Sequence, residues 1–398
     1  MTTGWWDDGG IGILRRGGSP ARVENPCHDE ASFPRGDARV SGDRGQIVHG
    51  VMSGENRTAR AAVLRACLAV AEPVYAGAMG VRNWMFDRGV KKVHRLGRPV
   101  ISVGNITTGG TGKTPVVRWV AERLREMGKR PAILSRGYKS QGTGMGDELT
   151  MLDRMLNEGK EAKVYLAANA DRVAGAQGVL REHPEVDVFV LDDAFQHRRV
   201  ARDLDIVLIS AANPFGFGRV LPRGLLRERL SGLARADVFI LTHADQASED
   251  ELRKIDVTIQ KYHAAPTILR AVHAQTGLWT SGGKQPMEAL RGRRFFLFAG
   301  IANPGSFERQ LRAYGKPVGH RWFGDHHDYQ AGQIRELRDQ AKSAGAESLV
   351  TTEKDWVKIA EMCSDEEGLP PVWRVEMELH FLGDDSDRVV SKLKAVVG

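Results

Sequence analysis

The sequence has few cysteines and no long apolar run. Its three cysteines are widely separated and form neither a disulfide framework nor a zinc-binding pattern, which is typical of a reducing cytoplasm (Cys27, Cys67 and Cys363). No stretch approaches the roughly 18–20 uninterrupted apolar residues that span a bilayer, so we do not expect an integral membrane protein. The first residues also lack the apolar segment of a secretory signal.

The chain lacks a general excess of charge as well. Its net charge is +7, and residues 57–98 alone contain nine Lys/Arg against two acidic residues, so the remainder is balanced. This excludes a broad nucleic-acid-binding surface, and no nucleic-acid partner or obligate protein partner is expected. With 398 residues, of which 41% are hydrophobic, the chain can bury a large core.

Composition divides the chain into four parts. Residues 1–56 are rich in glycine without apolar periodicity and are expected to be a disordered extension, although Met52 leaves a mis-assigned start open. Residues 57–98 form a basic helical segment. We expect a P-loop core domain over 99–280 and a smaller α/β domain over 281–398, with the boundary placed where glycines and a proline interrupt the pattern.

Apolar residues recur at helical spacing between residues 58 and 92, and Pro73 is expected to kink or divide this helix. Lys and Arg border the apolar stripe, an arrangement that suits the plane of an anionic membrane surface. The alternative is a helix packed on the protein's own core.

Nearly continuous apolar runs follow from residue 99 onward, alternating with helical patterns, and they are typical of buried parallel strands. We predict strands at 100–103, 131–134, 186–191, 204–209 and 238–241, and a second set at 295–298, 348–351 and 372–375 with helices near 305–314 and 330–344. The fold class is therefore α/β: a parallel sheet of P-loop NTPase type between layers of helices, with a second smaller α/β domain and an N-terminal amphipathic helix.

The strongest local signal is a glycine-rich loop that follows a predicted strand and opens a helix. Its residues are Thr107, Thr108, Gly109, Gly110, Thr111, Gly112, Lys113 and Thr114. Such a loop turns backbone N–H groups toward phosphate oxygens. Lys113 would reach the β and γ phosphates of ATP, and the Thr114 hydroxyl would bind Mg²⁺.

Acidic residues follow two other strands. Asp192 and Asp193 end an apolar run, where one carboxylate could hold Mg²⁺ and the other orient it, and residues 194–199 add polar and basic groups. Asp147 and Glu148 follow a glycine-rich loop and could supply a general base and a metal ligand, or merely acids at a helix N-terminus.

Residues 323–329 concentrate two histidines and two aspartates. They could be metal ligands, although the spacing is tight for one site. In a catalytic interpretation, one of the aspartates orients one of the histidines, which shares a proton with a substrate hydroxyl or another carboxylate. In a third interpretation they cap a helix that begins near Tyr329.

Taken together, these motifs resemble the tetraacyldisaccharide 4'-kinase family over residues 60–380. The resemblance rests on the order and spacing of Val103–Pro115, Leu134–Tyr138, Gly146–Glu148, Leu191–Arg198, Leu221–Glu228, Ala299–Ile301, Phe323–His326 and Thr351–Asp355. Thr107 occupies the position of the first glycine of other P-loops, and members of this family also lack that glycine. Ala194 and Arg229 depart from its usual pattern and put only local loop geometry in doubt.

The resemblance implies transfer of the γ-phosphoryl group of ATP to the 4'-hydroxyl of a tetraacylated glucosamine disaccharide 1-phosphate. Two alternatives are a membrane-associated P-loop ATPase switch that binds a protein partner, and a metallochaperone-type NTPase that uses the histidines and aspartates of residues 323–329. In the kinase, Asp147 and His326 would act as a proton-accepting pair oriented by Asp325, with Asp192, Asp193 and Glu148 at the Mg²⁺ end. Arg227, less surely Arg223, would contact phosphate. The resemblance also implies a peripheral location on the cytoplasmic face of the bacterial inner membrane, where residues 58–92 meet the anionic surface and the glycolipid.

Overall fold

A computed structural model describes residues 50–137, 147–301, 304–325, 327–363 and 368–398, and for Asp147 and Glu148 the backbone alone. Most of the predicted extension, residues 1–49, lies outside this description. The first long element is α2 (Ala59–Asp87), whose N-cap Thr58 accepts a hydrogen bond from the backbone N–H of Ala61.

The sheet that carries the glycine-rich loop consists of parallel neighbours in the order β7-β6-β5-β1-β4-β2-β3. Strands β1, β4, β5 and β6 are almost wholly buried, as their continuous apolar sequences predict. The bounds are β1 (Val100–Asn105), β2 (Pro131–Ser135), β3 (Tyr165–Ala168), β4 (Val188–Asp192), β5 (Leu204–Ser210), β6 (Val238–Thr242) and β7 (Thr267–Thr280).

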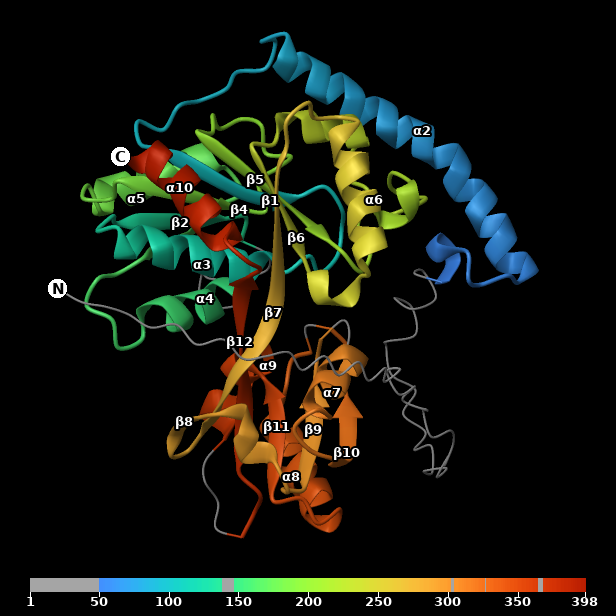
Figure 1. The fold of residues 1–398 in the computed structure, drawn as a ribbon, viewed down its shortest axis with the longest axis vertical. Helices are drawn as coiled ribbons and strands as arrows, with labels where there is room; N and C mark the ends of the chain where they lie inside the picture. Colours follow the sequence, from blue (N-terminus) through green and yellow to red (C-terminus); the bar gives the residue numbers. More distant parts are fainter. Residues whose placement is uncertain (1–49, 138–146, 302–303, 326, 364–367) are drawn as a thin grey trace, which may run out of the picture. The chain divides into compact units, whose positions relative to one another are not determined.

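Two long strands connect this sheet to a second group of strands (Figure 1). Beyond its pairing with β6, β7 pairs antiparallel with β12 (Val372–Phe381). Strand β12 continues through parallel pairs to β11 (Ser348–Thr352), β9 (Phe295–Ala299) and β10 (Pro317–Trp322). The short β8 (Gly283–Gln285) turns back onto the end of β7.

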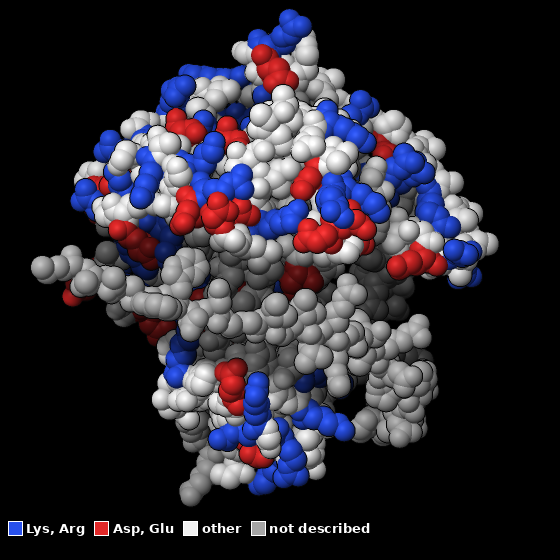
Figure 2. Space-filling view, in the orientation of Figure 1, with Lys and Arg blue, Asp and Glu red and all other residues white. Residues whose placement is uncertain are grey.

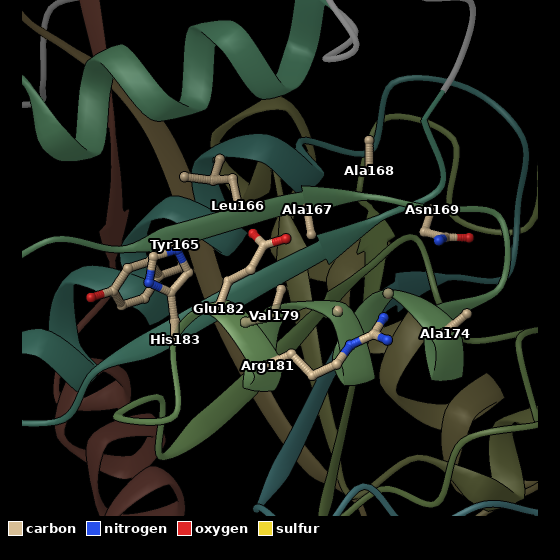
Figure 3. Close-up of a pocket in the computed structure, with 12 residues that line it drawn as sticks. Tyr165, Leu166, Ala167, Ala168, Asn169, Ala174, Val179, Arg181, Glu182 and His183 are labelled. Atoms are coloured by element: carbon tan, nitrogen blue, oxygen red, sulfur yellow. The ribbon is translucent and has the colours of Figure 1, made fainter.

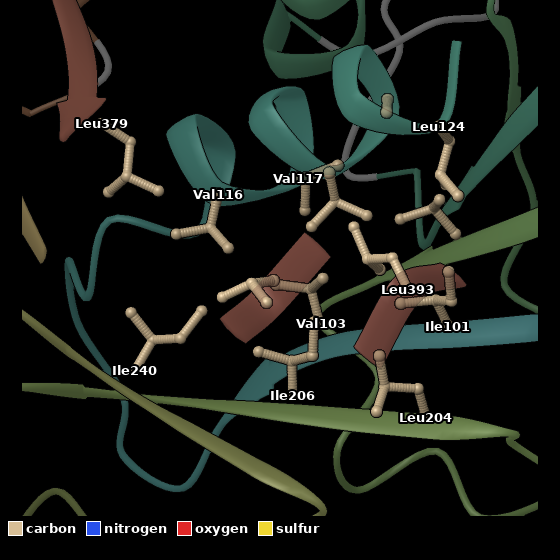
Figure 4. Packing of buried hydrophobic residues seen from close by; sticks show 14 of the residues in the cluster. Ile101, Val103, Val116, Val117, Leu124, Leu204, Ile206, Ile240, Leu379 and Leu393 are labelled. Atoms are coloured by element: carbon tan, nitrogen blue, oxygen red, sulfur yellow. The ribbon is translucent and has the colours of Figure 1, made fainter. Parts of the chain in front are cut away.

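Helices cover both faces of the first sheet. On one face, α3, α4 and the final helix α10 share a core with β1; Figure 4 shows Ile101 and Val103 of β1 beneath Val116 and Val117 of α3. On the other face, α5, α6 and part of α2 pack on the alternate residues of the same strands. The bounds are α3 (Lys113–Glu126), α4 (Asp147–Asn157), α5 (Arg172–Glu182), α6 (Glu249–Gln260), α7 (Pro304–Leu311), α8 (Ala331–Ser343), α9 (Glu353–Ile359) and α10 (Asp385–Val397).

These elements confirm the predicted α/β fold with its parallel sheet between helices. Pro73 was expected to kink or divide the first helix; the division is wrong, because Pro73 lies inside one continuous helix. Pro73 is exposed, so water can satisfy the carbonyl group whose partner the proline removes. Figure 2 shows acidic and basic side chains interspersed on the face in view, consistent with the balanced charge outside residues 57–98.

Candidate active site

The glycine-rich loop joins β1 to α3, as the sequence predicts. All six residues of β1 are buried, and the chain then passes through residues 106–112 to Lys113, the first residue of α3, and Thr114, the second. Gly112 precedes the helix in the left-handed backbone region with φ 73°, and no side chain caps the first turn. The uncapped N–H groups and the helix dipole make this end of α3 a position for an anion.

Gly112 is also required for space. An ideal Cβ atom at this position would lie 2.4 Å from the ring of His273 on β7. That ring is 8% exposed, its nitrogens have no hydrogen-bond partner among the described residues, and its centroid lies 4.6 Å from that of His243. Burial, with His243 adding to it, lowers the pKa of His273 to about 3, so this imidazole is neutral at neutral pH.

Hydrogen bonds to neighbouring segments hold the loop in place. The backbone N–H of Thr108 donates to the carbonyl of Leu225 at 2.7 Å, and that of Arg227 donates to the carbonyl of Ile106 at 2.8 Å. From β6, the Thr242 hydroxyl donates to the carbonyl of Thr111 at 2.9 Å. The loop is therefore fixed on both sides, and Arg227 is brought beside it.

The centre of the site is Asp193, the residue that follows β4. Its Oδ1 lies 2.8 Å from Nη1 of Arg227 and 3.7 Å from Nζ of Lys113. Lys113 is also 3.5 Å from Oδ1 of Asn105 at the end of β1. Lys113, Asp193 and Arg227 are distant in sequence and were each predicted as site residues, and they meet at the carboxyl edge of the sheet.

The surroundings of Asp193 keep it ionised. Burial raises the pKa of this carboxyl group, but Lys113 and Arg227 outweigh it, so the pKa lies below its ordinary value. The backbone at Asp193 is left-handed, with φ 50°. For a residue with a side chain this costs roughly 1 kcal/mol or more, and such strain is often found where function fixes a side-chain direction.

Asp192 occupies the last position of β4, beside Asp193. Its Oδ2 accepts a hydrogen bond from the Ser135 hydroxyl at 3.3 Å, and its carbonyl accepts one from Arg172 at 3.1 Å. Ser135 ends β2, so this carboxylate faces a neighbouring strand of the sheet. The two aspartates therefore diverge: Asp193 faces the P-loop lysine, and Asp192 faces β2.

Gln196 is a residue of the site whose role the sequence left unspecified. Its amide donates to the carbonyl of Asn105 at 3.0 Å and to Oε1 of Glu228 at 3.1 Å, and its Oε1 lies 3.4 Å from Arg227. It belongs to the polar stretch 194–199, which was the available signal. No sequence pattern pointed to Arg172, because it reaches the carbonyl of Asp192 only once α5 is folded onto the sheet.

Arg223 is directed elsewhere. Its Nη1 lies 3.2 Å from Oε2 of Glu72 on α2, and Oε1 of Glu72 accepts the backbone N–H of Val220 at 3.2 Å. Of the two arginines considered, Arg227 is the one beside Lys113 and Asp193.

The predicted proton-transfer residues are only partly described. Asp147 and Glu148 begin α4, but their side chains lie outside the described atoms, and His326 lies outside the described residues. Asp325 is described: its Oδ1 lies 3.0 Å from Nζ of Lys354.

The second histidine of the cluster has structural contacts. The ring of His327 stacks on Phe323 with centroids 4.5 Å apart, and its Nε2 lies 3.2 Å from Oε1 of Gln333. Nearby, buried Asp355 accepts hydrogen bonds from the Tyr329 hydroxyl and the backbone N–H of Gly300. Within the described ranges, no three His, Cys, Asp or Glu side chains gather as metal ligands.

A separate cavity of about 380 Å³ lies between β3 and α5 (Figure 3). Tyr165 stacks on His183 at one end of it, with centroids 4.1 Å apart. None of the predicted site residues lines this cavity, so it is distinct from the candidate active site.

Helix α2 turns one face to the rest of the chain. The Tyr75 hydroxyl donates to the carbonyl of Arg227 at 3.2 Å, and the Asn83 amide donates to Glu228 at 2.7 Å. Arg82 donates to the carbonyl of Gln196 at 2.7 Å. The last four turns of α2 are therefore attached to the same segments that form the site.

The other face of α2 is apolar and exposed. Its side chains recur at helical spacing and are between 54% and 75% exposed (Val63, Val70, Val74, Val81 and Trp84). Contiguous apolar patches on a surface are often interaction sites. By length and composition α2 would also suffice to cross a membrane, which is weak evidence taken alone.

Comparisons with known proteins identify similar chains. A sequence profile described as tetraacyldisaccharide-1-P 4'-kinase matches residues 64–397. The tetraacyldisaccharide 4'-kinase of Anaeromyxobacter dehalogenans is 38% identical over 349 residues, which cover 80% of this chain and 87% of the relative. That of Geobacter metallireducens is 40% identical over 315 residues, covering 75% and 90%. A crystal structure of LpxK from Aquifex aeolicus in complex with ATP is similar with a TM-score of 0.65 and 27% identity, covering 84% of this chain and 100% of that one.

Proposed function

Because the chain belongs to the tetraacyldisaccharide-1-P 4'-kinase family, it uses ATP to phosphorylate the 4'-hydroxyl of a lipid A precursor, and we propose that the site around Lys113 and Asp193 performs this transfer. The observation that carries the proposal is the meeting of Lys113, Asp193 and Arg227 at the end of the P-loop. A P-loop switch for a protein partner and a metallochaperone are not favoured.

ATP would lie with its phosphates on the loop 107–114. The uncapped N–H groups of α3 and the Lys113 ammonium supply positive charge there. Arg227 adds a second cation beside the same carboxylate. Charge that develops on the transferred phosphoryl group is stabilised by such prearranged donors, which is the largest protein contribution in this kind of reaction.

We propose that Mg²⁺ binds at this edge, where the carboxylate of Asp193 supplies an oxygen donor. Asp192 faces β2 in the structure, and Glu148 is included because of the family resemblance. Asp193, Asp192, the Thr114 hydroxyl and Glu148 are the residues that would hold it, directly or through water. The lowered pKa of Asp193 keeps a full negative charge available. When bound, Mg²⁺ would neutralise charge on the phosphates.

The acceptor hydroxyl needs a base, since its own pKa is far above 7. Asp147 with His326 is our proposal for that base, with Asp325 as the residue that orients the histidine. The support is the resemblance of these positions to the family motifs, together with the start of α4 at Asp147.

The apolar face of α2 is proposed to lie on the cytoplasmic face of the inner membrane. The opposite face is bonded to the segments around Gln196 and Arg227, so the helix cannot be surrounded by lipid on all sides. It would instead rest in the interface, where enzyme and glycolipid meet in one plane. In this proposal residues 57–98 attach the protein, 99–280 bind ATP, and 281–398 complete the site.

The experiment that tests the proposed site compares label transfer from γ-labelled ATP to tetraacyl disaccharide 1-phosphate by the wild type, Lys113→Ala and Lys129→Ala. Lys129 is a partly exposed lysine beyond the far end of α3 and serves as the matched control. We expect transfer by the wild type and the control, and almost none by Lys113→Ala. Equal transfer by all three would remove the P-loop lysine from the mechanism.

A further inference from the structure

A cationic pocket opens where α2 ends. Its volume is about 370 Å³, and its lining residues are Arg82, Phe86, Lys91, Lys92, His94 and Arg199. None of the six is acidic. It is separate from the P-loop site, and nothing in the catalytic proposal uses Lys91, Lys92 or His94.

Backbone hydrogen bonds hold the pocket in place. The N–H of Lys91 donates to the carbonyl of Met85 at 3.0 Å, which fixes the turn after α2. The N–H of His94 donates to the carbonyl of Arg199 at 2.7 Å, and Ala201 returns a bond to the carbonyl of His94 at 2.9 Å. The lysines are therefore placed opposite Arg199 by the fold itself.

The positive charge in this pocket is only partly balanced by the protein. Asp171 pairs with the lining residue Arg199 at 3.1 Å, whereas Asp87 pairs at 2.6 Å with Arg198, which does not line the pocket. In the part of the chain that the structure describes, no carboxylate forms an ion pair with Arg82, Lys91 or Lys92. Nη1 of Arg82 is buried, and no described group accepts a hydrogen bond from it.

The ring of Phe86 makes cation–π contacts with basic side chains at the pocket. The guanidinium carbon of Arg82 lies 5.4 Å from the ring centroid and Nζ of Lys91 lies 5.7 Å from it. The guanidinium carbon of Arg198, outside the lining, lies 5.3 Å from the same centroid. Burial lowers the pKa of Arg82, as expected of a charge that is poorly solvated. A planar guanidinium with two ammonium groups around one cavity matches the oxygens of a phosphate ester.

The pocket lies at the end of the apolar face of α2. Val81 and Trp84 lie just before it in the chain, and Val90 (61% exposed) and Val93 (46% exposed) border its lysines. A lipid would therefore bring its acyl chains to the apolar side chains and its headgroup to the cations.

We propose that this pocket binds the phosphate group of a membrane lipid. The proposal rests on the membrane attachment proposed above. It adds a specific headgroup site to that attachment, and through Arg82 and Gln196 the occupied pocket is connected to Asn105 and Arg227 of the active site.

The test compares two variants of the full chain that remove the same charge from the same segment. Lys91→Gln/Lys92→Gln removes two pocket cations, and Arg88→Gln/Arg95→Gln removes two exposed cations that do not line the pocket. Binding is measured to phosphate-free glycolipid vesicles that contain equal mole fractions of either phosphatidylglycerol or the carboxylate lipid cholesteryl hemisuccinate. The KM for tetraacyl disaccharide 1-phosphate in detergent is measured in parallel.

For vesicles that contain phosphatidylglycerol, we expect the affinity of the pocket variant to fall roughly fivefold or more below that of the control variant. For vesicles that contain cholesteryl hemisuccinate, we expect the affinities of the two variants to fall equally. Equal vesicle binding with a KM that rises only in the pocket variant would also support the proposal and would assign the pocket to the 1-phosphate of the acceptor. Equal losses by the two variants in every assay would overturn it. If the pocket variant still transfers label from ATP to the lipid in detergent, the proposed kinase site is supported whether or not the pocket binds lipid.

Discussion

The ammonium group of Lys113 lies 3.7 Å from the carboxylate of Asp193. Arg227 donates a hydrogen bond to the same oxygen, so two cations share one anion at the end of the P-loop. A partly exposed ion pair of this kind contributes little to folding stability, and Asp193 adopts a left-handed backbone to make it. The arrangement is consistent with the role in phosphoryl transfer that we propose for these three residues.

Asp193→Asn is predicted to lower kcat by about a hundredfold or more, because it removes the negative charge that positions Lys113, Arg227 and a bound cation. The measurement is steady-state kinetics across a Mg²⁺ titration. Asp187→Asn, an acid at the other end of the same strand region, is the control. Asp193→Asn with wild-type kcat at every Mg²⁺ concentration would show that this carboxylate has no part in transfer.

Asp147→Ala is predicted to abolish most phosphoryl transfer while ATP binding persists, since the proposed base acts on the acceptor and not on the nucleotide. Nucleotide affinity by equilibrium titration and turnover by label transfer separate the two effects. Near-normal turnover of a folded Asp147→Ala would remove this residue from the mechanism.

Val70→Asp/Val74→Asp is predicted to weaken vesicle binding and to raise the KM for lipid more than the KM for ATP. Both valines are at least 73% exposed on the apolar face of α2, and neither belongs to the hydrophobic cluster through which Tyr75 and Ala76 pack on the core. Val257→Asp, at a 51% exposed valine of α6, is the control. Deleting residues 58–80 would be a poorer test, because it also removes Glu72 and Tyr75, which bond to residues 220–227. Unchanged vesicle binding by the double variant would argue against the interfacial role of this face.

His273 is predicted to make folding stability depend on pH. Its pKa is about 3 in the folded chain against an ordinary 6.5, so its contribution is present above pH 6.5 and is lost as the pH falls toward 3. At about pH 5 the unfolded chain gains a proton that the folded chain does not, which costs roughly 2 kcal/mol. Urea unfolding at about pH 7.5 and about pH 5 should show a smaller acid loss in His273→Gln than in the wild type by about that amount. Identical losses would mean that this ring is protonated in the folded protein.

Much of the fold was predictable because buried parallel strands have continuous apolar sequences. Strands β1, β4, β5 and β6 were found from this signal, and the P-loop from its glycines and lysine. Strand β3 is only half buried and β7 alternates buried and half-buried positions over most of its length, so neither gave an apolar run.

The parts of the site that escaped prediction depend on tertiary contacts. Asp193 was expected beside a metal, but its pairing with Arg227 arises because residues 220–228 fold back onto the P-loop. Gln196 joins Asn105 to Glu228 through contacts between segments far apart in sequence. The pocket at Lys91 and Lys92 could not be found from charge alone, since only the folded turn brings Arg199 opposite the lysines.

The position of the transferred phosphate tests the central claim most directly. The purified chain is incubated with ATP, Mg²⁺ and tetraacyl disaccharide 1-phosphate, and the lipid product is analysed by phosphorus–proton correlation NMR. We predict one new phosphomonoester, coupled to the proton on carbon 4' of the distal sugar, with its formation lost in Lys113→Ala. Phosphate attached at another hydroxyl, or released only as inorganic phosphate, would contradict the account.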